Sequence, residues 1–359
     1  AGGMASQTVE LARLMAEDGA KVVVVSATAP CRPRWVEGIP IVRTAIRLVG
    51  LCLALWRAAG RAELVHVLAS SGLSWHLIAA PAICIARLRG RPVVVHYHGG
   101  LADDFLGRSL KTVRGTLRLG SALVVPSAFL LGVFRRYGFD ADVVPNVVDL
   151  SAFAAAPRAP RDAKTVVVAV TRNLEPVYDI HAAVRAIGHL RARGYDARLE
   201  IAGTGSLEGD LRALVREQGL EPYVHFHGHL TKGEIAQLLA RTDAMLNPSR
   251  ADNVPVSVLE AMASARPIVS TRAGGIPYLL ADGLTALLVE VGADEAMANA
   301  IARLVDEPDL ASRLATAAAI EVRRYHWPEL RDQWAAIYNA ARSGSRVRLM
   351  ASSDQPGLQ

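Results

Sequence analysis

Two loops in the first half of this 359-residue chain carry residues that could contact a ligand. Gly2-Gly3 stands directly before a helical pattern, and glycine lets backbone N–H groups approach an anion at the start of a helix. His98 follows a run of valines and precedes Gly99-Gly100, so it is placed to donate a hydrogen bond to a ligand oxygen. An ordinary turn at Gly2-Gly3 and a packed core position for His96 are the structural alternatives.

Two glycine loops follow apolar runs in the second half of the chain. Gly203-Thr204-Gly205 resembles the start of a dinucleotide fingerprint, but that fingerprint needs a third glycine where Glu208 stands, and it belongs to the first strand–helix unit of its domain. A nicotinamide cofactor is therefore not favoured. Gly274-Gly275 is expected to offer backbone N–H groups to a ligand.

The segment from Asn247 to Pro255 leads into the apolar run Val256–Ala263 and gives the strongest pattern. Pro255 suits a first helical turn, and Asp252 or Asn253 can cap it. Glu260 stands eight residues after Asp252, a rise of about 12 Å if the whole span were helical, which is about the length of a diphosphate–ribose unit. A carboxylate can accept two hydrogen bonds from a ribose diol, and helix N–H groups can hold phosphate. The structural alternative is a capped helix with one solvated Glu.

Arg172 directly follows the Val-rich run Thr165–Thr171, at the end of a predicted strand where ligands bind in parallel sheets. The alternative is a surface guanidinium that pairs with Glu175 or Asp179.

No resident metal or other cofactor is expected. The three cysteines show no CxxC spacing, and His96 with His98 lacks a third ligand. The alternating His225, His227 and His229 are expected to pack or face water, and Asp140-Ala141-Asp142 fits a turn.

The elements that must position these loops alternate between strands and helices, which predicts an α/β fold of two Rossmann-like, doubly wound parallel sheets facing a cleft. In the first half we expect helices at 8–18, 46–59, 74–89, 107–119 and 127–137, and strands at 21–26, 64–68, 92–96, 122–125 and 142–144. In the second half we expect strands at 165–171, 197–202, 223–226, 244–247, 268–271 and 286–289, with helices over 309–342 broken at Trp327-Pro328.

The predicted domains are residues 1–155 and residues 164–325, joined by a linker that contains Pro157 and Pro160. A strand is expected ahead of Gly2, outside this sequence. Residues 343–359 are expected to form a disordered tail.

Charge separates the two halves. Residues 1–150 hold 17 Lys+Arg against 10 Asp+Glu, whereas the remainder holds 23 against 24. We therefore expect the first half to bind a negatively charged partner, either a membrane surface or a phosphorylated ligand. Nucleic acid is not favoured, since there is no basic run interleaved with aromatic residues.

The longest apolar runs, Leu48–Trp56 and Leu77–Ala86, are shorter than the ~20 residues of a spanning helix, and arginines follow both. They are read either as buried helices with solvated ends or as a face that docks on anionic lipid. Few cysteines indicate a reducing compartment, so we expect a cytoplasmic protein, with a peripheral position on the inner face of the membrane as an option.

The run from Asp252 to Ala263, followed by Arg266-Pro267-Ile268-Val269 and Gly274-Gly275-Ile276-Pro277, resembles the signature of retaining family 4 glycosyltransferases (glycosyl transferases group 1). The resemblance extends to Gly2-Gly3, His98-Gly99-Gly100, Pro145-Asn146 with Asp149, Arg172, Gly203–Gly205 and the Trp327 region. It implies the two-domain GT-B fold, with an acceptor-side domain first, a nucleotide-sugar donor domain second, and a helix over 326–342 that crosses back.

The resemblance also implies a role for each residue. Glu260 would hold the ribose of a nucleotide diphosphate sugar, Asp252 the hydroxyls of the donor sugar, and Arg172 the diphosphate. His98 would sit near the reacting sugar. Backbone groups around phosphate and sugar would come from Gly2, Gly3, Gly274 and Gly275; Asn253, Gly203 and Gly205 complete the expected donor-binding set.

Three departures from the family pattern are evident. The family usually has Glu at the Asp252 position, Gly at the Val147 position, and Lys where this chain has Val177. One cation of the diphosphate clamp is then missing, and Arg250, Arg272 or the helix that begins near Pro255 could replace it.

The implied function is a metal-independent, retaining transfer of sugar to a hydroxyl acceptor, in the synthesis of cell-surface glycan, lipid-linked oligosaccharide or polysaccharide. A non-catalytic sugar-nucleotide-binding protein and a nucleotide-sugar epimerase are the alternatives. An epimerase needs no acceptor, and a non-catalytic protein would not hydrolyse donor.

Overall fold

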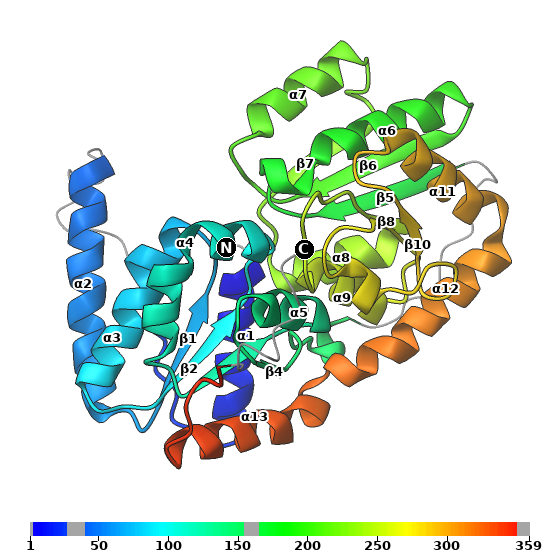
Figure 1. The fold of residues 1–359 in the computed structure, drawn as a ribbon. Helices are drawn as coiled ribbons and strands as arrows, with labels where there is room; N and C mark the ends of the chain where they lie inside the picture. The colour runs from blue at the N-terminus through cyan, green and yellow to red at the C-terminus, as the bar shows by residue number, and fades with distance from the viewer. Residues whose placement is uncertain (1–2, 27–39, 154–164, 350–359) are drawn as a thin grey trace. The chain divides into compact units, whose positions relative to one another are not determined.

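The computed structural model describes residues 3–26, 40–153 and 165–349, so Gly2, most of the predicted linker and the last ten residues lie outside the described part. Two compact units are present (Figure 1). The first comprises Gly3–Pro145 together with the described residues from Leu330 onward, and the second comprises the described residues of Asn146–Glu329.

The first unit is built on a four-stranded parallel sheet in the order β1-β2-β3-β4. The strands are β1 (Val65–Ala69), β2 (Val93–Tyr97), β3 (Ala122–Val125) and β4 (Asp142–Val143). The helices are α1 (Gly3–Glu17), α2 (Pro40–Arg61), the π-helical turn η2 (Trp75–Ala79), α3 (Ala80–Leu88), α4 (Ala102–Leu117), α5 (Ala128–Arg136) and α13 (Trp327–Arg342).

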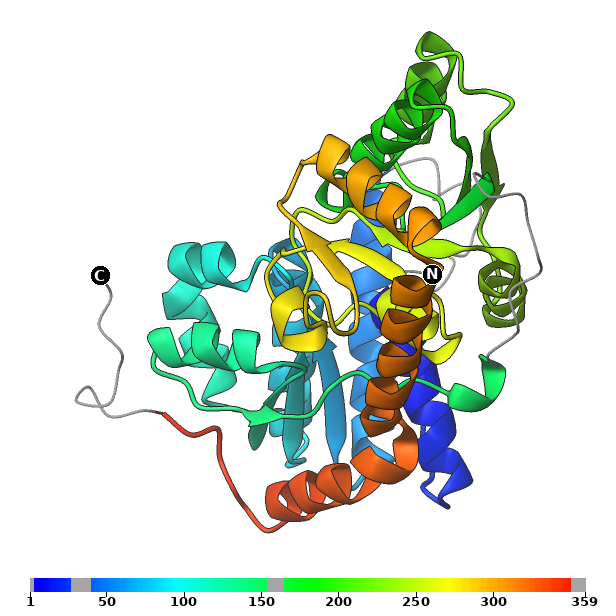
Figure 2. The same cartoon turned by 90° about the vertical axis from the view of Figure 1, so that its right-hand side faces the viewer.

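Side chains of β2 alternate between the two faces of this sheet. Val93, Val95 and Tyr97 belong to the apolar cluster that includes buried residues of α3, α4 and α5. His96 points the other way and contacts Trp334 of α13, with ring centroids 5.0 Å apart. Helices therefore cover both faces, and Figure 2 shows α4 and α5 on the side opposite to α1.

The strand predicted at 21–26 is wrong. These residues are not part of any strand, and Val22, Val23 and Val24 are 40%, 76% and 50% exposed. A β-branched run forms a strand only where a neighbouring strand accepts its backbone hydrogen bonds. Within the described residues β1 pairs only with β2, and the valine run does not pair with its other edge.

The second unit holds a six-stranded parallel sheet in the order β10-β9-β8-β5-β6-β7. The strands are β5 (Thr165–Thr171), β6 (Asp196–Ala202), β7 (Val224–Gly228), β8 (Ala244–Asn247), β9 (Ile268–Thr271) and β10 (Leu287–Val289). All six predicted strands are confirmed, with ends within two residues. The order reverses between β5 and β8, the switch point at which open parallel sheets bind ligands.

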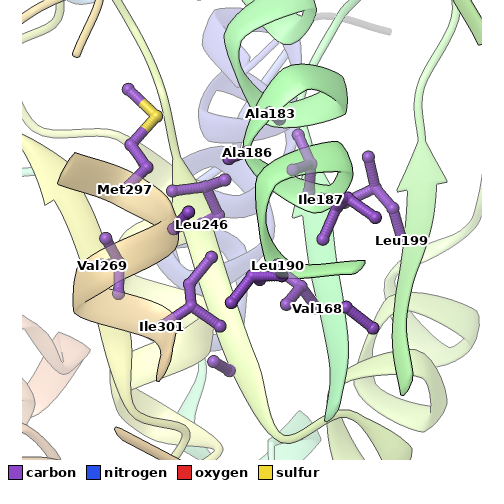
Figure 3. Close-up of a cluster of buried hydrophobic side chains, with 14 of the residues drawn as sticks. Val168, Ala183, Ala186, Ile187, Leu190, Leu199, Leu246, Val269, Met297 and Ile301 are labelled. Atoms are coloured by element: carbon purple, nitrogen blue, oxygen red, sulfur yellow. The ribbon is translucent and has the colours of Figure 1, made fainter. Parts of the chain in front are cut away.

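Helices cover both faces of this sheet. Figure 3 shows one face, where Val168, Leu199, Leu246 and Val269 pack against α6 and α11. The helices are α6 (Ile180–Ala192), α7 (Glu208–Glu217), α8 (Lys232–Arg241), α9 (Val256–Ala263), α10 (Ile276–Leu279), α11 (Asp294–Asp306) and α12 (Pro308–Glu321), with 3₁₀ turns η3 (Leu150–Ala152), η4 (Pro176–Tyr178) and η5 (Val322–Tyr325). The predicted two-domain α/β architecture is confirmed.

Candidate functional site

Arg172 follows β5 directly and is held on several sides by groups of the second unit. Its Nη2 donates to Asp252 Oδ2 over 2.6 Å, and its Nη1 donates to Ser257 Oγ over 3.2 Å. The guanidinium carbon lies 4.0 Å from the centre of the Tyr178 ring. The Arg172 and Asp252 side chains are only 10% and 11% exposed. The alternative pairing of Arg172 with Glu175 or Asp179 is therefore not what the structure shows.

Two polar atoms at the end of β5 have no hydrogen-bond partner among the described residues. They are Arg172 Nε and Thr171 Oγ1, and both are buried. A buried donor without a partner costs free energy, so natural proteins keep such atoms chiefly where a ligand or water satisfies them. The end of β5 thus holds two polar atoms that a ligand or a water molecule would satisfy.

Asp252 reaches Arg172 from the loop between β8 and α9, on the other side of the switch point. Its Oδ1 accepts from the backbone N–H of Asn253 over 3.0 Å. The predicted cap is wrong: Pro255 is itself the N-cap of α9, with extended backbone, and no side chain caps the helix. The carboxylate of Asp252 accepts a hydrogen bond from Arg172 instead, and the helix begins four residues after Asp252.

Glu260 lies in the second turn of α9 and is half-buried. Only the part of the span from Val256 onward is helical, so the distance of about 12 Å for a continuous helix from Asp252 does not apply. Arg172 nevertheless contacts the helix that carries Glu260, because its guanidinium donates to Ser257 of α9.

The glycines after β6 have a packing role. Gly203 has φ +147°, and a Cβ there would lie 2.0 Å from the carbonyl oxygen of Arg172. A Cβ on Gly205 would lie 2.3 Å from the carbonyl oxygen of Leu174. Both glycines therefore let this loop approach the backbone that carries Arg172.

The glycine pair after β9 is held against the Asp252 loop. Gly275 N–H donates to the carbonyl oxygen of Asp252 over 3.0 Å, and a Cβ on Gly275 would meet Asn253 Oδ1 at 2.5 Å. Gly274 has φ +52°. The N–H of Gly275, expected to face a ligand, is thus engaged within the protein, while the pair fixes the loop around Asp252.

The two arginines considered as replacements for the family Lys are paired elsewhere. Arg250 Nε lies 2.9 Å from Asp179 Oδ2. Arg272 pairs with Asp282 and lies 3.5 Å from Glu290. Arg172 is instead the guanidinium that the loop of Asp252 positions.

In the first unit, His98 follows β2 as predicted and belongs to a buried group with His66 and His96. The ring centroids of His96 and His98 are 4.0 Å apart, and those of His66 and His96 are 5.4 Å apart. Burial lowers the pKa of His98 to about 4. His98 is therefore a neutral imidazole whose buried Nε2 has no hydrogen-bond partner among the described residues.

The other motifs have structural partners. His227 pairs with Glu200, and Arg348 pairs with both Asp140 and Asp142. Among the described residues no group of three or more His, Cys, Asp or Glu side chains could hold a metal ion. Gly2 lies outside the described residues, and Gly3 is the first residue of α1.

Three residues that position the site were not assigned a role from the sequence. Ser257 and Tyr178 hold the guanidinium of Arg172, and Asn146 Nδ2 donates to the carbonyl oxygen of Val254 over 2.6 Å, bracing the loop before α9. Asn146 is 108 residues away from Val254. The sequence offers a partial signal for Ser257, which lies within the run from Asp252 to Ala263, and for Asn146, which is part of the family resemblance.

Comparisons with known proteins define the class. The model described as Glycosyltransferase Family 4 matches residues 1–152, and that described as Glycosyl transferases group 1 matches residues 164–307. Glycogen synthase of Mycobacterium tuberculosis is 27% identical over 384 residues, covering 96% of this chain and 92% of the relative. A phosphatidyl-myo-inositol mannosyltransferase of Mycobacterium leprae is 26% identical over 373 residues, covering 97% and 96%.

Solved structures share the architecture. Sucrose-phosphate synthase of Thermosynechococcus elongatus superimposes with a TM-score of 0.75 at 18% identity, covering 96% of this chain and 95% of that one. HepE of Anabaena, in complex with UDP and glucose, gives a TM-score of 0.67 at 22% identity, covering 81% of each chain. The fold is that of a GT-B glycosyltransferase. The chain belongs to the family 4-type glycosyltransferases.

Proposed function

We propose that this glycosyltransferase takes its sugar from a nucleotide diphosphate sugar bound to the second unit. The observation that carries the proposal is Arg172, a nearly buried guanidinium at the switch point of the sheet, positioned by Asp252 and stacked on Tyr178. A fixed cation in this position would stabilise the negative charge that a departing diphosphate gains. The related HepE is bound to UDP and, in another structure, to UDP-glucose, which makes UDP sugars the first donors to test.

The proposed reaction retains the configuration of the sugar and needs no metal. The acceptor hydroxyl attacks from the face that the diphosphate leaves, and its proton goes to the departing phosphate oxygen. Arg172 and backbone N–H groups offset the charge on the diphosphate, Glu260 holds the ribose, and Asp252 stays close enough to contact sugar hydroxyls. His98, neutral at physiological pH, would donate a hydrogen bond to the sugar. The acceptor belongs to a glycan, a polysaccharide or a lipid-linked saccharide.

The test is donor turnover. The protein is incubated with UDP-glucose, UDP-N-acetylglucosamine and GDP-mannose, and released nucleotide diphosphate is measured with and without EDTA. We expect release from one donor, unaffected by EDTA. Water takes the place of the acceptor in this assay, so NMR recorded before mutarotation should show free α-sugar from an α-linked donor. Release of nucleotide only with added divalent metal, or free β-sugar as the first product, would contradict the metal-independent retaining mechanism; no release from any of the three donors would contradict the donor class.

A further inference from the structure

The long helix α2 turns an apolar face toward solvent. Val42, Ile46, Val49, Leu53 and Trp56 are between 38% and 61% exposed. Their spacing of four, three, four and three residues places them in one stripe along the helix. The exposed residues between them are Thr44, Ala45, Gly50 and Ala54, so no exposed charged side chain interrupts the stripe.

The opposite side of α2 is already packed. Leu51 and Ala59 are buried, and the helix lies along α3 (Figure 1). The apolar stripe is therefore not the core-facing side of α2 but a second apolar surface. A contiguous apolar surface of this kind marks an interaction site, whereas scattered exposed apolar residues do not.

Basic residues border the stripe, and acidic ones are absent from the helix. The 22 residues of α2 include four arginines and no Asp or Glu. Arg57 and Arg61 are exposed at its C-terminal end, where Arg89 places its guanidinium carbon 4.8 Å from the centre of the Trp56 ring. Tryptophan and arginine together suit the level of lipid headgroups, where the ring is half-buried and the cation meets phosphate.

We propose that α2 docks the protein on an anionic lipid bilayer, lying in the plane of the interface. The stripe would enter the boundary between headgroups and acyl chains, and Arg57, Arg61 and Arg89 would contact lipid phosphates. Charge favours lipid over a second copy of this chain, because two α2 helices side by side would bring eight arginines together without an acidic residue on either helix. No described helix is both long and apolar enough to cross the membrane.

Vesicle flotation tests the proposal without any glycosyl transfer. The full chain is mixed with vesicles of phosphatidylcholine alone or of phosphatidylcholine and phosphatidylglycerol in equal parts. We expect flotation with the anionic vesicles, and at least a tenfold weaker partition for Val49→Glu/Leu53→Glu. Ile320→Glu, which changes an equally exposed residue of α12, is the matched control and should float like the wild type. Arg57→Gln/Arg61→Gln should lose the preference for anionic lipid, as should the wild type at high salt.

Three results would overturn the proposal. The first is wild-type protein that stays with the soluble fraction in the presence of anionic vesicles. The second is Val49→Glu/Leu53→Glu floating as well as the wild type, with unchanged circular dichroism. The third is a lipid-free dimer that these substitutions dissociate, because the stripe would then be covered by a second copy.

Discussion

At the scale of single residues, the site depends on one ion pair. Arg172 is bound by the carboxylate of Asp252, the hydroxyl of Ser257 and the face of Tyr178, all within the second unit. Such a guanidinium loses little side-chain entropy when it meets a ligand, because its position is already fixed. Asp252 thus has two proposed tasks: it orients Arg172 and stays near the donor sugar.

Asp252→Asn tests the first of these tasks. The amide keeps the shape of the side chain but removes the charge opposite a nearly buried guanidinium, so we expect the free energy of unfolding to fall by about 2 kcal/mol. We also expect donor turnover to fall at least tenfold. The control is Asp282→Asn, whose partner Arg272 is 40% exposed, and whose loss should cost under ~1 kcal/mol. Urea unfolding and donor turnover are the measurements; an Asp252→Asn protein that matches the control in both would count against the ion pair.

Glu260→Gln tests the ribose assignment. If both carboxylate oxygens accept from the ribose diol, the amide loses one acceptor, and UDP should bind at least tenfold more weakly. A UDP analogue whose ribose lacks both secondary hydroxyls should bind wild type and variant alike. Glu290→Gln, at a side chain 81% exposed, serves as the control. Equal affinity of wild type and Glu260→Gln for UDP would remove Glu260 from the nucleotide site.

The candidate site residues could be selected from the sequence, but their partners in the structure could not. Arg172 follows a predicted strand and Asp252 precedes a predicted helix, so both positions are apparent from pattern alone. The pairing across 80 residues is not, because it depends on β5 and β8 being neighbours in the sheet. For the same reason the sequence could not show that the N–H of Gly275 donates to the carbonyl oxygen of Asp252.

At the scale of elements, α9 carries Glu260 and is followed, one residue after its C-cap, by a strained residue. Ala265 has φ +50°, its N–H donates to Met262 O, and the next N–H, of Arg266, donates to Ala261 O. This is a Schellman arrangement with alanine where glycine is preferred. The helix end is thus less stable than it could be.

Ala265→Gly should raise the free energy of unfolding by about 0.5–1 kcal/mol, because glycine adopts positive φ without a Cβ clash. Ala319→Gly, inside α12, should lower it by about 1 kcal/mol. Thermal unfolding of both variants beside the wild type gives the comparison. Destabilisation of similar size in the two variants would show that Ala265 is not strained.

The strands of the second unit were predictable because each is a short run that contains apolar residues and has a neighbour to pair with. The valine run after α1 resembles β5 in composition, yet it forms no strand, since composition does not report whether a partner edge is available. The predicted cap of α9 was wrong for a similar reason, because the carboxylate of Asp252 accepts a hydrogen bond from Arg172 instead.

At the scale of the whole molecule, the chain's last described helix returns to its first unit. Trp334 and Tyr338 of α13 cover the histidines of β1 and β2: Tyr338 Oη lies 2.9 Å from His66 Nδ1, and the Trp334 ring centroid lies 5.0 Å from those of both His66 and His96. The histidine group is uncharged in the folded state. Burial and then His98 lower the pKa of His66 to about 3, and burial with the neighbouring imidazoles lowers that of His96 well below its usual value.

Acid should therefore lower the stability of this unit. Below about pH 6.5 the unfolded chain binds protons that the folded histidines do not accept, so stability falls as pH falls, until the folded pKa values are reached near 4 and 3. His98 alone would contribute about 3 kcal/mol to this loss.

His96→Phe keeps an aromatic ring against Trp334 but removes one titrating group. We expect the decline in unfolding free energy between about pH 6.5 and about pH 4 to be shallower in this variant. The exposed His225 of β7, changed to Gln, should leave the decline unchanged. Urea titrations across this pH range measure both, and parallel curves for wild type and His96→Phe would mean that another group causes the acid sensitivity.

The central claim is that Arg172 holds the diphosphate of the donor, and calorimetric titration with UDP and with uridine tests it directly. We expect Arg172→Gln to weaken UDP binding at least tenfold, about 1.4 kcal/mol, while uridine binds wild type and variant equally. Arg272→Gln should bind UDP like the wild type. Undiminished UDP affinity in Arg172→Gln, or an equal loss for uridine, would contradict the claim.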